Sequence, residues 1–214
     1  MELKNLRPDD IKKAFKDHIP SAEGVTRNNS IMATLIEIDG KLHFVYTKRA
    51  LTLKHQPGDI CFPGGRQEKG ETAKEAAIRE TIEELGIEEK NINILGESDF
   101  IVTMFNTKVT PFVGILTDIS LNDLKPNPGE VDKIFAVPVE FFKETEPIKT
   151  ELSLKQTFPE DFPVDLIYNG ENYPWGKAYV PQLFYVYEGE TIWGLTARIT
   201  NNICDIIEKY KDFG

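Results

Sequence analysis

Three glutamates that lie close together in the sequence are the residues best suited to chemistry. At about 100° per residue, the spacing of Glu80, Glu83 and Glu84 places them on one face of a helix. Carboxylates crowded on one turn repel one another, and a hard dication such as Mg²⁺ or Mn²⁺ relieves the repulsion because it prefers oxygen ligands. Such a dication also lowers the pKa of a bound water, so the cluster indicates metal-assisted hydrolysis.

The segment that carries these glutamates is predicted to be a loop followed by a helix over residues 73–85. Thr72 and Glu75 have the spacing of a capping box, which satisfies free amides of the first turn, and Gly86 is the expected left-handed stop. The face opposite the glutamates is predicted to pack into the core. It carries the aliphatic residues Ile78, Ile82 and Leu85.

Two glycines and an arginine accompany the glutamates. Gly64 and Gly65 allow backbone conformations closed to other residues, and can aim a carbonyl at a metal or let a phosphate come near. Arg79 can pair with Glu83 one turn away, or hold a neighbouring carboxylate in place. For the glutamates alone, a solvated helix face with ordinary salt bridges is the simpler interpretation. The longer pattern around them favours a catalytic one.

That longer pattern resembles the Nudix box. From Gly65 to Ile87 the chain reads G-x5-E-x7-R-E-T-x-E-E-x-G-I, and it departs from the family pattern only at Thr81, where an aliphatic residue is usual. The resemblance implies a Nudix-type α/β/α sandwich with a mixed β-sheet. It also implies an enzyme that uses Mg²⁺ or Mn²⁺ to hydrolyse a nucleoside diphosphate linked to another group.

Carried over by position, the resemblance gives these residues roles. The implied metal ligands are Glu80, Glu83 and Glu84, a backbone carbonyl at Gly65, and Glu71 as an accessory ligand or a brace for the loop. Arg79 is implied to orient the ligand glutamates. Glu80 or Glu83 is the candidate general base, although the family sometimes uses a glutamate outside this segment.

A narrower resemblance extends over residues 30–200, to the coenzyme A pyrophosphatase branch of the family. Segments 47–50 and 56–65 look like the signature of that branch, which often has Thr at the position of Thr81. Ala50 and Asp59 depart from the signature, and both lie where it is thought to read coenzyme A. The other similar segments are residues 110–114, 130–138 and 192–197.

The reaction implied by this branch cuts coenzyme A or an acyl-coenzyme A to 3′,5′-ADP and (acyl-)4′-phosphopantetheine. The candidate substrate-binding residues are Arg49, Arg66, Lys54 and His55, since Arg in particular makes bidentate contacts with phosphate. A solvated loop explains Lys54 and His55 equally well. Trp175 and Tyr173 are candidates for a wall against adenine or pantetheine, or for a dimer contact, whereas Trp193 is expected in the core.

Two other functions stay open. The chain can act on another nucleotide, such as ADP-ribose, a dinucleotide, NADH or an oxidised nucleoside triphosphate. It can also be a non-catalytic Nudix domain that only binds a nucleotide or a partner protein. The presence of Glu80, Glu83 and Glu84 argues against this last function, because a binding-only descendant is free to lose metal ligands. The family resemblance is the one ground for expecting a homodimer.

Composition sets the remaining expectations. Residues 1–214 are expected to form a single Nudix hydrolase domain, with an irregular excursion at about residues 144–181. A formal net charge of −10 argues against nucleic-acid binding but not against a small anionic substrate, because a bound cation inverts the local field. Cys61 and Cys204 are expected to be reduced, buried thiols. With no apolar leader and no membrane-length segment, the chain is expected to be cytoplasmic.

Hydrophobic periodicity and turn signals predict the other elements. Helices are expected at residues 8–17 and 196–210, and a loop that ends in a short strand at residues 50–61. Strands are expected at residues 30–38, 42–47, 92–95, 101–104, 109–116, 131–139 and 183–187. The irregular alternation of strands and helices favours a mixed sheet with helices on its faces.

Overall fold

A mixed β-sheet forms the centre of the molecule. The computed structural model describes residues 6–211, and within them an eight-stranded sheet has the path β3-β2-β1-β7-β5, with β4, β6 and β8 paired onto β1, β7 and β2. The strands are β1 (Arg27–Ile38), β2 (Lys41–Arg49), β3 (Ile60–Cys61), β4 (Gly64–Arg66), β5 (Ile92–Glu97), β6 (Ile101–Val102), β7 (Thr107–Leu116) and β8 (Val131–Pro138). Strands β1 and β7 are parallel and the other pairs are antiparallel, which confirms the predicted mixed sheet.

Alternation along the central strands sorts side chains to the two faces of this sheet. On β1, Ala33 and Leu35 belong to one buried cluster, whereas Met32 and Ile36 belong to clusters on the opposite face. The hairpin from β1 to β2 turns at residues 39–40, with φ of 50° and 74°, as a two-residue turn between right-twisted strands requires. The turn thus fixes the pairing register of β1 and β2, which determines which side chains lie on each face of the sheet.

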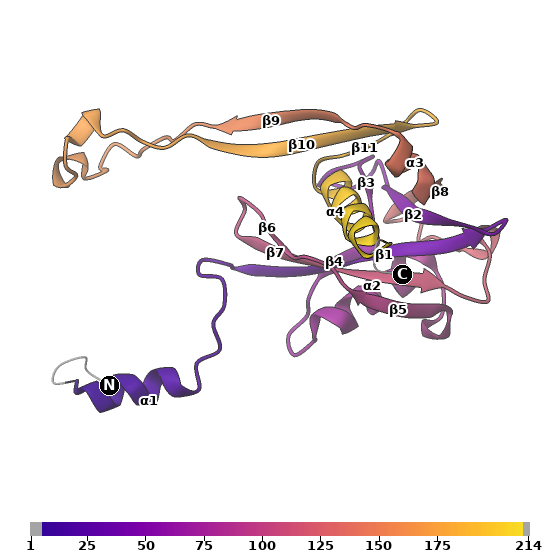
Figure 1. The fold of residues 1–214 in the computed structure, drawn as a ribbon, viewed down its shortest axis with the longest axis horizontal. Helices are drawn as coiled ribbons and strands as arrows, with labels where there is room; N and C mark the ends of the chain where they lie inside the picture. Colours follow the sequence, from indigo (N-terminus) through magenta and orange to yellow (C-terminus); the bar gives the residue numbers. More distant parts are fainter. Residues whose placement is uncertain (1–5, 212–214) are drawn as a thin grey trace.

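Helices cover both faces of the sheet (Figure 1). Helix α2 (Ala73–Leu85) contributes Ala77 and Leu85 to the clusters on one face. Helix α4 (Gly194–Lys211) contributes Ile199 and Ile203 to the cluster on the other face, where Phe44 and Tyr46 of β2 also lie. The predicted α/β/α layering is therefore confirmed.

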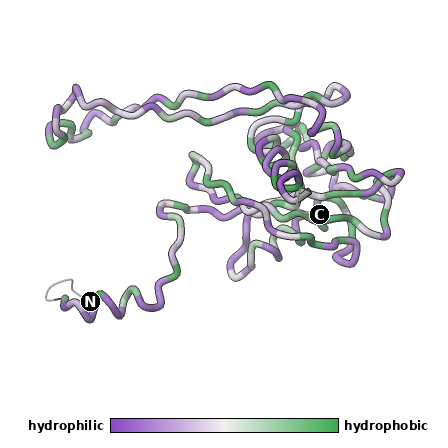
Figure 2. Tube along the Cα trace, in the orientation of Figure 1, coloured by the Kyte–Doolittle hydropathy of each residue, from purple (hydrophilic) through white to green (hydrophobic). Residues whose placement is uncertain are grey.

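Residues 144–181 are irregular, as the sequence predicted, only between about residues 155 and 177, and strands form on either side of that stretch. Strand β9 (Ile148–Leu154) pairs with β10 (Ala178–Tyr187), which pairs with β11 (Glu190–Trp193), and all pairs are antiparallel. The outer part of β9 and β10 projects from the domain as a two-stranded ribbon (Figure 1). Every residue of β9 is exposed, and hydrophobic and hydrophilic residues are interspersed along the ribbon (Figure 2). The strand therefore lacks the buried face from which a strand is usually predicted.

Packed aromatic rings close the far end of this ribbon. The rings of Phe158 and Phe162 lie 4.6 Å apart, and Trp175 lies 4.8 Å from both Phe158 and Tyr173, measured between centroids. Two short 3-10 turns, Val164–Leu166 and Gly170–Asn172, complete the tip. Trp175 and Tyr173 thus pack against the ribbon's own residues at its tip.

The predicted helices are all present. Residues 73–85 coincide with α2, residues 196–210 lie within α4, and residues 8–17 correspond to α1 (Pro8–Lys16). Helix α1 has no buried residue and lies apart from the sheet (Figure 1). Four elements were not predicted: strands β4, β9 and β11 and helix α3 (Val139–Glu144). The remaining turns of 3-10 helix are Glu89–Asn91 and Leu121–Asp123.

The two cysteines are free thiols, as predicted. Cys204 is buried and Cys61 is partly buried. Burial raises the pKa of Cys61 to about 11 and that of Cys204 to about 12, so both stay protonated at neutral pH. Across residues 6–211, no helix combines the length and the apolar character needed to cross a membrane.

Candidate active site

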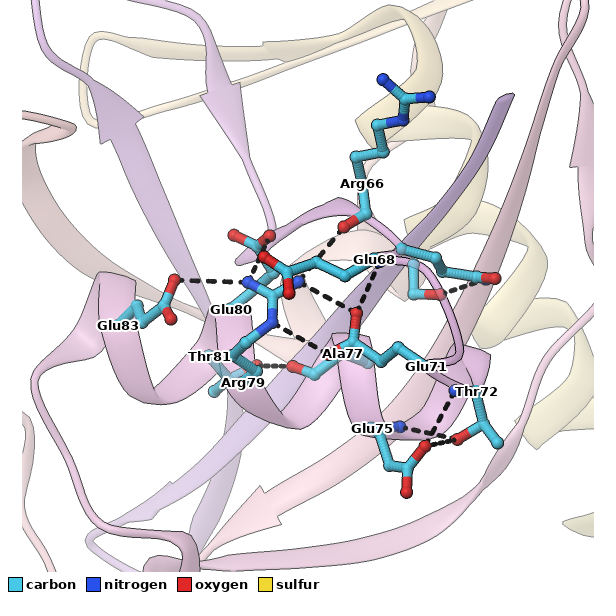
Figure 3. A network of polar contacts seen from close by, with 12 residues as sticks. Arg66, Glu68, Glu71, Thr72, Glu75, Ala77, Arg79, Glu80, Thr81 and Glu83 are labelled. Atoms are coloured by element: carbon cyan, nitrogen blue, oxygen red, sulfur yellow. Dashed lines mark hydrogen bonds and ion pairs between the residues drawn. The ribbon is translucent and has the colours of Figure 1, made fainter. Parts of the chain in front are cut away.

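Local capping fixes the position of helix α2. Glu75 donates its backbone N–H to the hydroxyl of Thr72 at 3.2 Å, and its carboxylate accepts the backbone N–H of Thr72 at 2.8 Å (Figure 3). Gly86 ends the helix in the left-handed region with φ 64°. A side chain at Gly86 would collide with the backbone carbonyl of Lys125. Both ends of the helix therefore match the prediction, and they set the direction of its glutamates.

The buried face of α2 differs only in part from the predicted one, because Leu85 is buried as predicted and Ile78 packs at the margin of a core cluster. This face consists of Ala76, Ala77, Thr81, Glu84 and Leu85. Ile78 and Ile82, which were predicted to face the core, are only partly buried and line a hollow of about 580 Å³ on the outer side of the helix. Small side chains let the helix backbone approach the sheet closely, so they take the inner face in place of the larger aliphatic residues.

Thr81, the one departure from the family pattern, fits this buried face. Its hydroxyl donates to the carbonyl of Ala77 at 2.6 Å, and the side chain has no exposed surface. A threonine can satisfy its hydroxyl within its own helix in this way. Thr81 at this position therefore leaves its own buried hydroxyl hydrogen-bonded.

Arg79 joins three glutamates into one network (Figure 3). Its guanidinium donates to both carboxylate oxygens of Glu71, at 2.9 and 3.2 Å. Its Nη1 donates to Glu80 at 2.8 Å and to Glu83 at 3.4 Å. Its Nη2 also donates to the backbone carbonyl of Arg66, at 3.1 Å. The planar, multidentate guanidinium can hold several carboxylates in fixed directions, and these contacts support the orienting role expected of Arg79.

Glu71 lies at the end of the loop that leads into α2. Besides its two bonds from Arg79, its carboxylate accepts the backbone N–H of Glu68 at 2.8 Å. The hydrogen bonds from Arg79 and from the Glu68 backbone lower the pKa of Glu71, so the carboxylate stays ionised. Of the two roles predicted for Glu71, these contacts favour the brace for the loop.

Glu84 is buried rather than solvated. Only 6% of the residue is exposed, and its carboxylate accepts from the backbone N–H of Gly64 and from the hydroxyl of Thr47, both at 3.3 Å. Burial raises the pKa of Glu84 to about 7, and the negative charge of Glu80 adds to the rise. The expectation that all three glutamates lie on a face away from the core is therefore wrong for Glu84.

Glu80 lies directly against the segment that contains Gly64 and Gly65, called the glycine loop below. A Cβ on Gly65 would stand 2.5 Å from the carboxylate carbon of Glu80, so a larger residue at this position would displace the Glu80 carboxylate. Burial raises the pKa of Glu80, the hydrogen bond from Arg79 opposes that rise, and the charges of Glu83 and Glu130 add to it. Glu130 precedes strand β8, and the prediction of site residues missed it because only folding brings it near Glu80.

Arg49 supplies a positive charge beside these carboxylates. Its Nε is buried and has no hydrogen-bond partner among residues 6–211. Elsewhere the guanidinium donates to the carbonyl of His55 at 3.3 Å and interacts with the Cys61 side chain. The charge of Arg49 lowers the pKa values of Glu84 and Cys61, which opposes the effect of their burial. A buried guanidinium N–H without a partner is costly, so the site is suited to an anionic ligand.

A comparison with known protein families assigns this arrangement. The model of the NUDIX domain matches residues 26–163, which contain the glycine loop, α2 and Arg49. The chain belongs to the Nudix family. Its hydrolases act on acid anhydrides, and the family membership inferred from the residues around α2 is confirmed.

Several curated Nudix proteins are similar to this chain. Nudix hydrolase 3 of Caenorhabditis elegans is 34% identical over 140 residues, which cover 64% of this chain and 58% of that protein. Peroxisomal coenzyme A diphosphatase NUDT7 of Mus musculus is 35% identical, over 53% of this chain and 48% of that protein. An uncharacterized Nudix hydrolase, NudL of Photorhabdus laumondii, is 30% identical over 88% of this chain and 91% of its own length. The chain spans about half the length of several of these curated relatives.

Two solved Nudix structures illustrate the alignments found with this chain. A C. elegans Ap4A hydrolase in a binary complex aligns with a TM-score of 0.45 and 20% identity, over 52% of this chain and 80% of that one. A MutT/nudix family protein from Enterococcus faecalis aligns with a TM-score of 0.47 and 13% identity, over 97% of this chain and 72% of that one.

The carboxylates of Glu80, Glu83 and Glu84, called the Nudix carboxylates below, offer the oxygen ligands that a hard divalent cation prefers. In the part of the chain that the structure describes, no three His, Cys, Asp or Glu side chains are already gathered around one point. Glu84 is nevertheless buried and Glu80 partly buried, and each carries a raised pKa to which a neighbouring carboxylate contributes. A cation with oxygen ligands relieves such a repulsion.

The other predicted substrate residues lie farther from the Nudix carboxylates. Lys54 and His55 are exposed on the loop before β3, and only the backbone carbonyl of His55 contacts Arg49. The side chain of Arg66 is exposed and points away from the Arg79 network (Figure 3). Of the four predicted substrate residues, the structure places only Arg49 beside the carboxylates.

We expect Gly65→Ala to lower the turnover of this Nudix protein while the fold stays intact. The added methyl group displaces the Glu80 carboxylate from its bond with Arg79, whereas most of the core is untouched. The expected loss of turnover is about 10- to 100-fold, as when support for a metal ligand is removed. Turnover and thermal unfolding of the two proteins, measured side by side, test this. Gly96→Ala is the matched control, because a Cβ there meets no atom within 4 Å. Unchanged turnover in Gly65→Ala would show that the position of Glu80 is unimportant.

Proposed function

We propose that this Nudix protein hydrolyses the diphosphate bond of coenzyme A or an acyl-coenzyme A, giving 3′,5′-ADP and (acyl-)4′-phosphopantetheine. The observation that carries the proposal is the partly buried Arg49, whose buried Nε has no partner in the described part of the chain and whose charge acts on the Glu84 carboxylate. Arg49 lies in segment 47–50, one of the two segments that resemble the coenzyme A pyrophosphatase signature. The 35% identity with a mouse coenzyme A diphosphatase supports the same substrate.

The residues of α2 have distinct parts in this proposal. Glu80, Glu83 and Glu84 supply oxygen ligands for Mg²⁺ or Mn²⁺, with the backbone at Gly65 close by. When bound, such a cation neutralises diphosphate charge and makes a coordinated water more acidic. Arg79 donates to the carboxylates of Glu80 and Glu83 and so orients both of them.

Arg49 and one glutamate complete the proposed site. Arg49 donates to a phosphate oxygen through the Nε that otherwise has no partner. A glutamate accepts the proton of the attacking water as the new bond to phosphorus forms and the bridging P–O bond breaks. Glu80 and Glu83 are candidates for this base. Glu130 is a third, since its charge already raises the pKa of Glu80 and it lies outside the Nudix box.

Incubation with a panel of substrates tests the proposal. The purified protein is mixed with Mg²⁺ or Mn²⁺ and, separately, with coenzyme A, an acyl-coenzyme A, ADP-ribose, NADH, a diadenosine polyphosphate and a nucleoside triphosphate. The products are then separated by chromatography. The expected products from coenzyme A are 3′,5′-ADP and 4′-phosphopantetheine. Coenzyme A left intact while ADP-ribose or a dinucleotide is cleaved would replace the proposed substrate. No turnover with tight binding of a nucleotide would instead identify a binding domain.

The assembly state and the cellular compartment need separate measurements. The homodimer that the family resemblance suggests is tested by light scattering of the purified protein. Two of the similar proteins, from Mus musculus and Caenorhabditis elegans, are named as peroxisomal. The cytoplasmic location expected from the sequence therefore stays a prediction, to be tested by imaging a tagged chain.

A further inference from the structure

A second cavity lies on the other side of strand β3 from the carboxylates. Its volume is about 370 Å³, and it forms where the loop before β3 meets the hairpin between β10 and β11, which lies beside β3 (Figure 1). Among its lining residues are Gly58, Ile60, Phe184, Glu190, Thr191 and Trp193. Two of these, Gly58 and Ile60, belong to segment 56–65, which resembles the coenzyme A pyrophosphatase signature.

An open aromatic wall forms one side of this cavity. Phe184 and Trp193 are cross-strand neighbours, and their rings stack with centroids 5.7 Å apart and an angle of 12° between planes. Trp193 is 41% exposed, so the prediction that it packs in the core is wrong. A stacked aromatic pair that faces a cavity offers a large apolar surface to a ligand.

The backbone connects this cavity to the proposed phosphate site. Gly58 donates to the carbonyl of Arg49 at 3.0 Å, and Arg49 donates to the carbonyl of Asp59 at 2.9 Å. Cys61 lies on the carboxylate side of the strand, with its sulfur 3.3 Å from the Thr47 hydroxyl that reaches Glu84. Three residues of chain span at most about 11 Å, so Gly58 and Cys61 lie within that distance of each other. An extended substrate can therefore reach both places around the edge of β3.

The side chains that line the cavity indicate which end of a substrate can bind there. Glu190 accepts from Lys48 at 2.9 Å and from Lys133 at 3.1 Å, and its side chain is 16% exposed. Both lysines are thus occupied, and the charged group in the lining is a carboxylate. As residues 6–211 form it, the lining holds no lysine or arginine that could receive a phosphate, whereas Ile60, Phe184 and Trp193 offer apolar surface to an uncharged, apolar end.

We propose that this cavity binds the apolar end of the substrate, on the far side of the diphosphate from the nucleoside. For an acyl-coenzyme A, this end is the acyl group together with the adjoining part of the pantetheine arm. The inference rests on the proposed function and adds to it a determinant of acyl preference. Trp193 is a specificity residue in this assignment and has no part in bond cleavage.

Fluorescence of Trp193 tests the cavity without any turnover. The chain has two tryptophans, so Trp175→Phe leaves Trp193 as the only one. This variant is titrated in Mg²⁺ with octanoyl-4′-phosphopantetheine, which is the product of the proposed reaction and carries the apolar end. Saturable change in emission is expected, at lower concentration than with 4′-phosphopantetheine, and no change with 3′,5′-ADP. Absence of a change with the octanoyl compound, or an equal change with 3′,5′-ADP, would overturn the proposal.

Kinetics of Trp193→Ala give the second test. We expect kcat/KM for octanoyl-coenzyme A to fall at least roughly tenfold, and kcat/KM for coenzyme A, which lacks the acyl group, to fall by a clearly smaller factor. The matched control is Val186→Ala, because Val186 is 55% exposed on the same strand as Phe184 but does not line the cavity. An equal loss with both substrates would mean that Trp193 is only structural. If no coenzyme A derivative is cleaved, the proposed function fails, and the fluorescence titration still decides whether the cavity binds the acyl end.

Discussion

Glu83→Gln and Glu80→Gln are each expected to lower turnover more than about 100-fold while the protein stays folded. Loss of a residue that merely supports a metal ligand already costs about 10- to 100-fold, and these substitutions remove a proposed ligand itself. The Glu83 side chain is 53% exposed and its ion pair with Arg79 spans 3.4 Å, so its loss costs little stability. Turnover at a series of Mg²⁺ concentrations, together with thermal unfolding of each variant, measures both effects.

Glu89→Gln is the matched control for these two variants. Glu89 is exposed and lines the same outer hollow as Glu83, but it makes no contact with Arg79 that would place it in the site network. We expect its turnover to stay within about twofold of the wild-type value. Near-normal turnover in both Glu80→Gln and Glu83→Gln would refute the ligand assignment. An equal loss in Glu89→Gln would point to the overall charge of the hollow instead.

Helix α2 was predictable to the residue because local contacts define it. Thr72 and Glu75 are three residues apart, and their capping bonds need no partner from elsewhere in the chain. Gly86 ends the helix through its own backbone conformation. The contact of Arg79 with Glu83 also lies within one turn of the helix, and the sequence predicted it for that reason.

The buried part of the site depends on contacts between residues far apart in the chain, which sequence patterns do not reveal. The burial of Glu84 follows from the close approach of Ala76 and Ala77 to the sheet, which the larger Ile78 and Ile82 had obscured in the pattern. Its contact with Thr47 joins residues 37 positions apart. The outer part of the β9–β10 ribbon was missed for a different reason, because a strand exposed on both faces has no pattern of burial to reveal it.

In the presence of a chelator, Glu84→Gln is expected to be more stable than the wild-type protein at pH 8 and equally stable near pH 4. Burial raises the pKa of Glu84 from 4.5 to about 7. Between these values the unfolded chain has lost the proton and the folded protein still holds it. The wild-type free energy of unfolding therefore falls as pH rises through this window and levels off above pH 7. At 1.36 kcal/mol per unit, the loss amounts to about 3 kcal/mol.

The glutamine variant removes this loss with little change in shape. Its amide oxygen can still accept the Gly64 N–H, and its amide nitrogen can meet the Thr47 hydroxyl. Urea unfolding at several pH values measures the difference between variant and wild type. Glu71→Gln is the control of opposite sign: the hydrogen bonds from Arg79 lower the pKa of Glu71, so its charge stabilises the fold at neutral pH. That variant is expected to be less stable than the wild type at pH 8.

Addition of Mg²⁺ separates the role of Glu84 as a ligand from the cost of its burial. A cation that binds only the folded protein stabilises it by RT ln(1 + [L]/Kd), so the wild type gains stability as Mg²⁺ is added. Glu84→Gln is expected to gain less, because it lacks one anionic oxygen ligand, and its advantage at pH 8 shrinks or reverses. Equal gains in both proteins would exclude Glu84 as a ligand. A variant less stable than the wild type at pH 8 in chelator would show that the ionised carboxylate stabilises the fold, contrary to the effect of its burial.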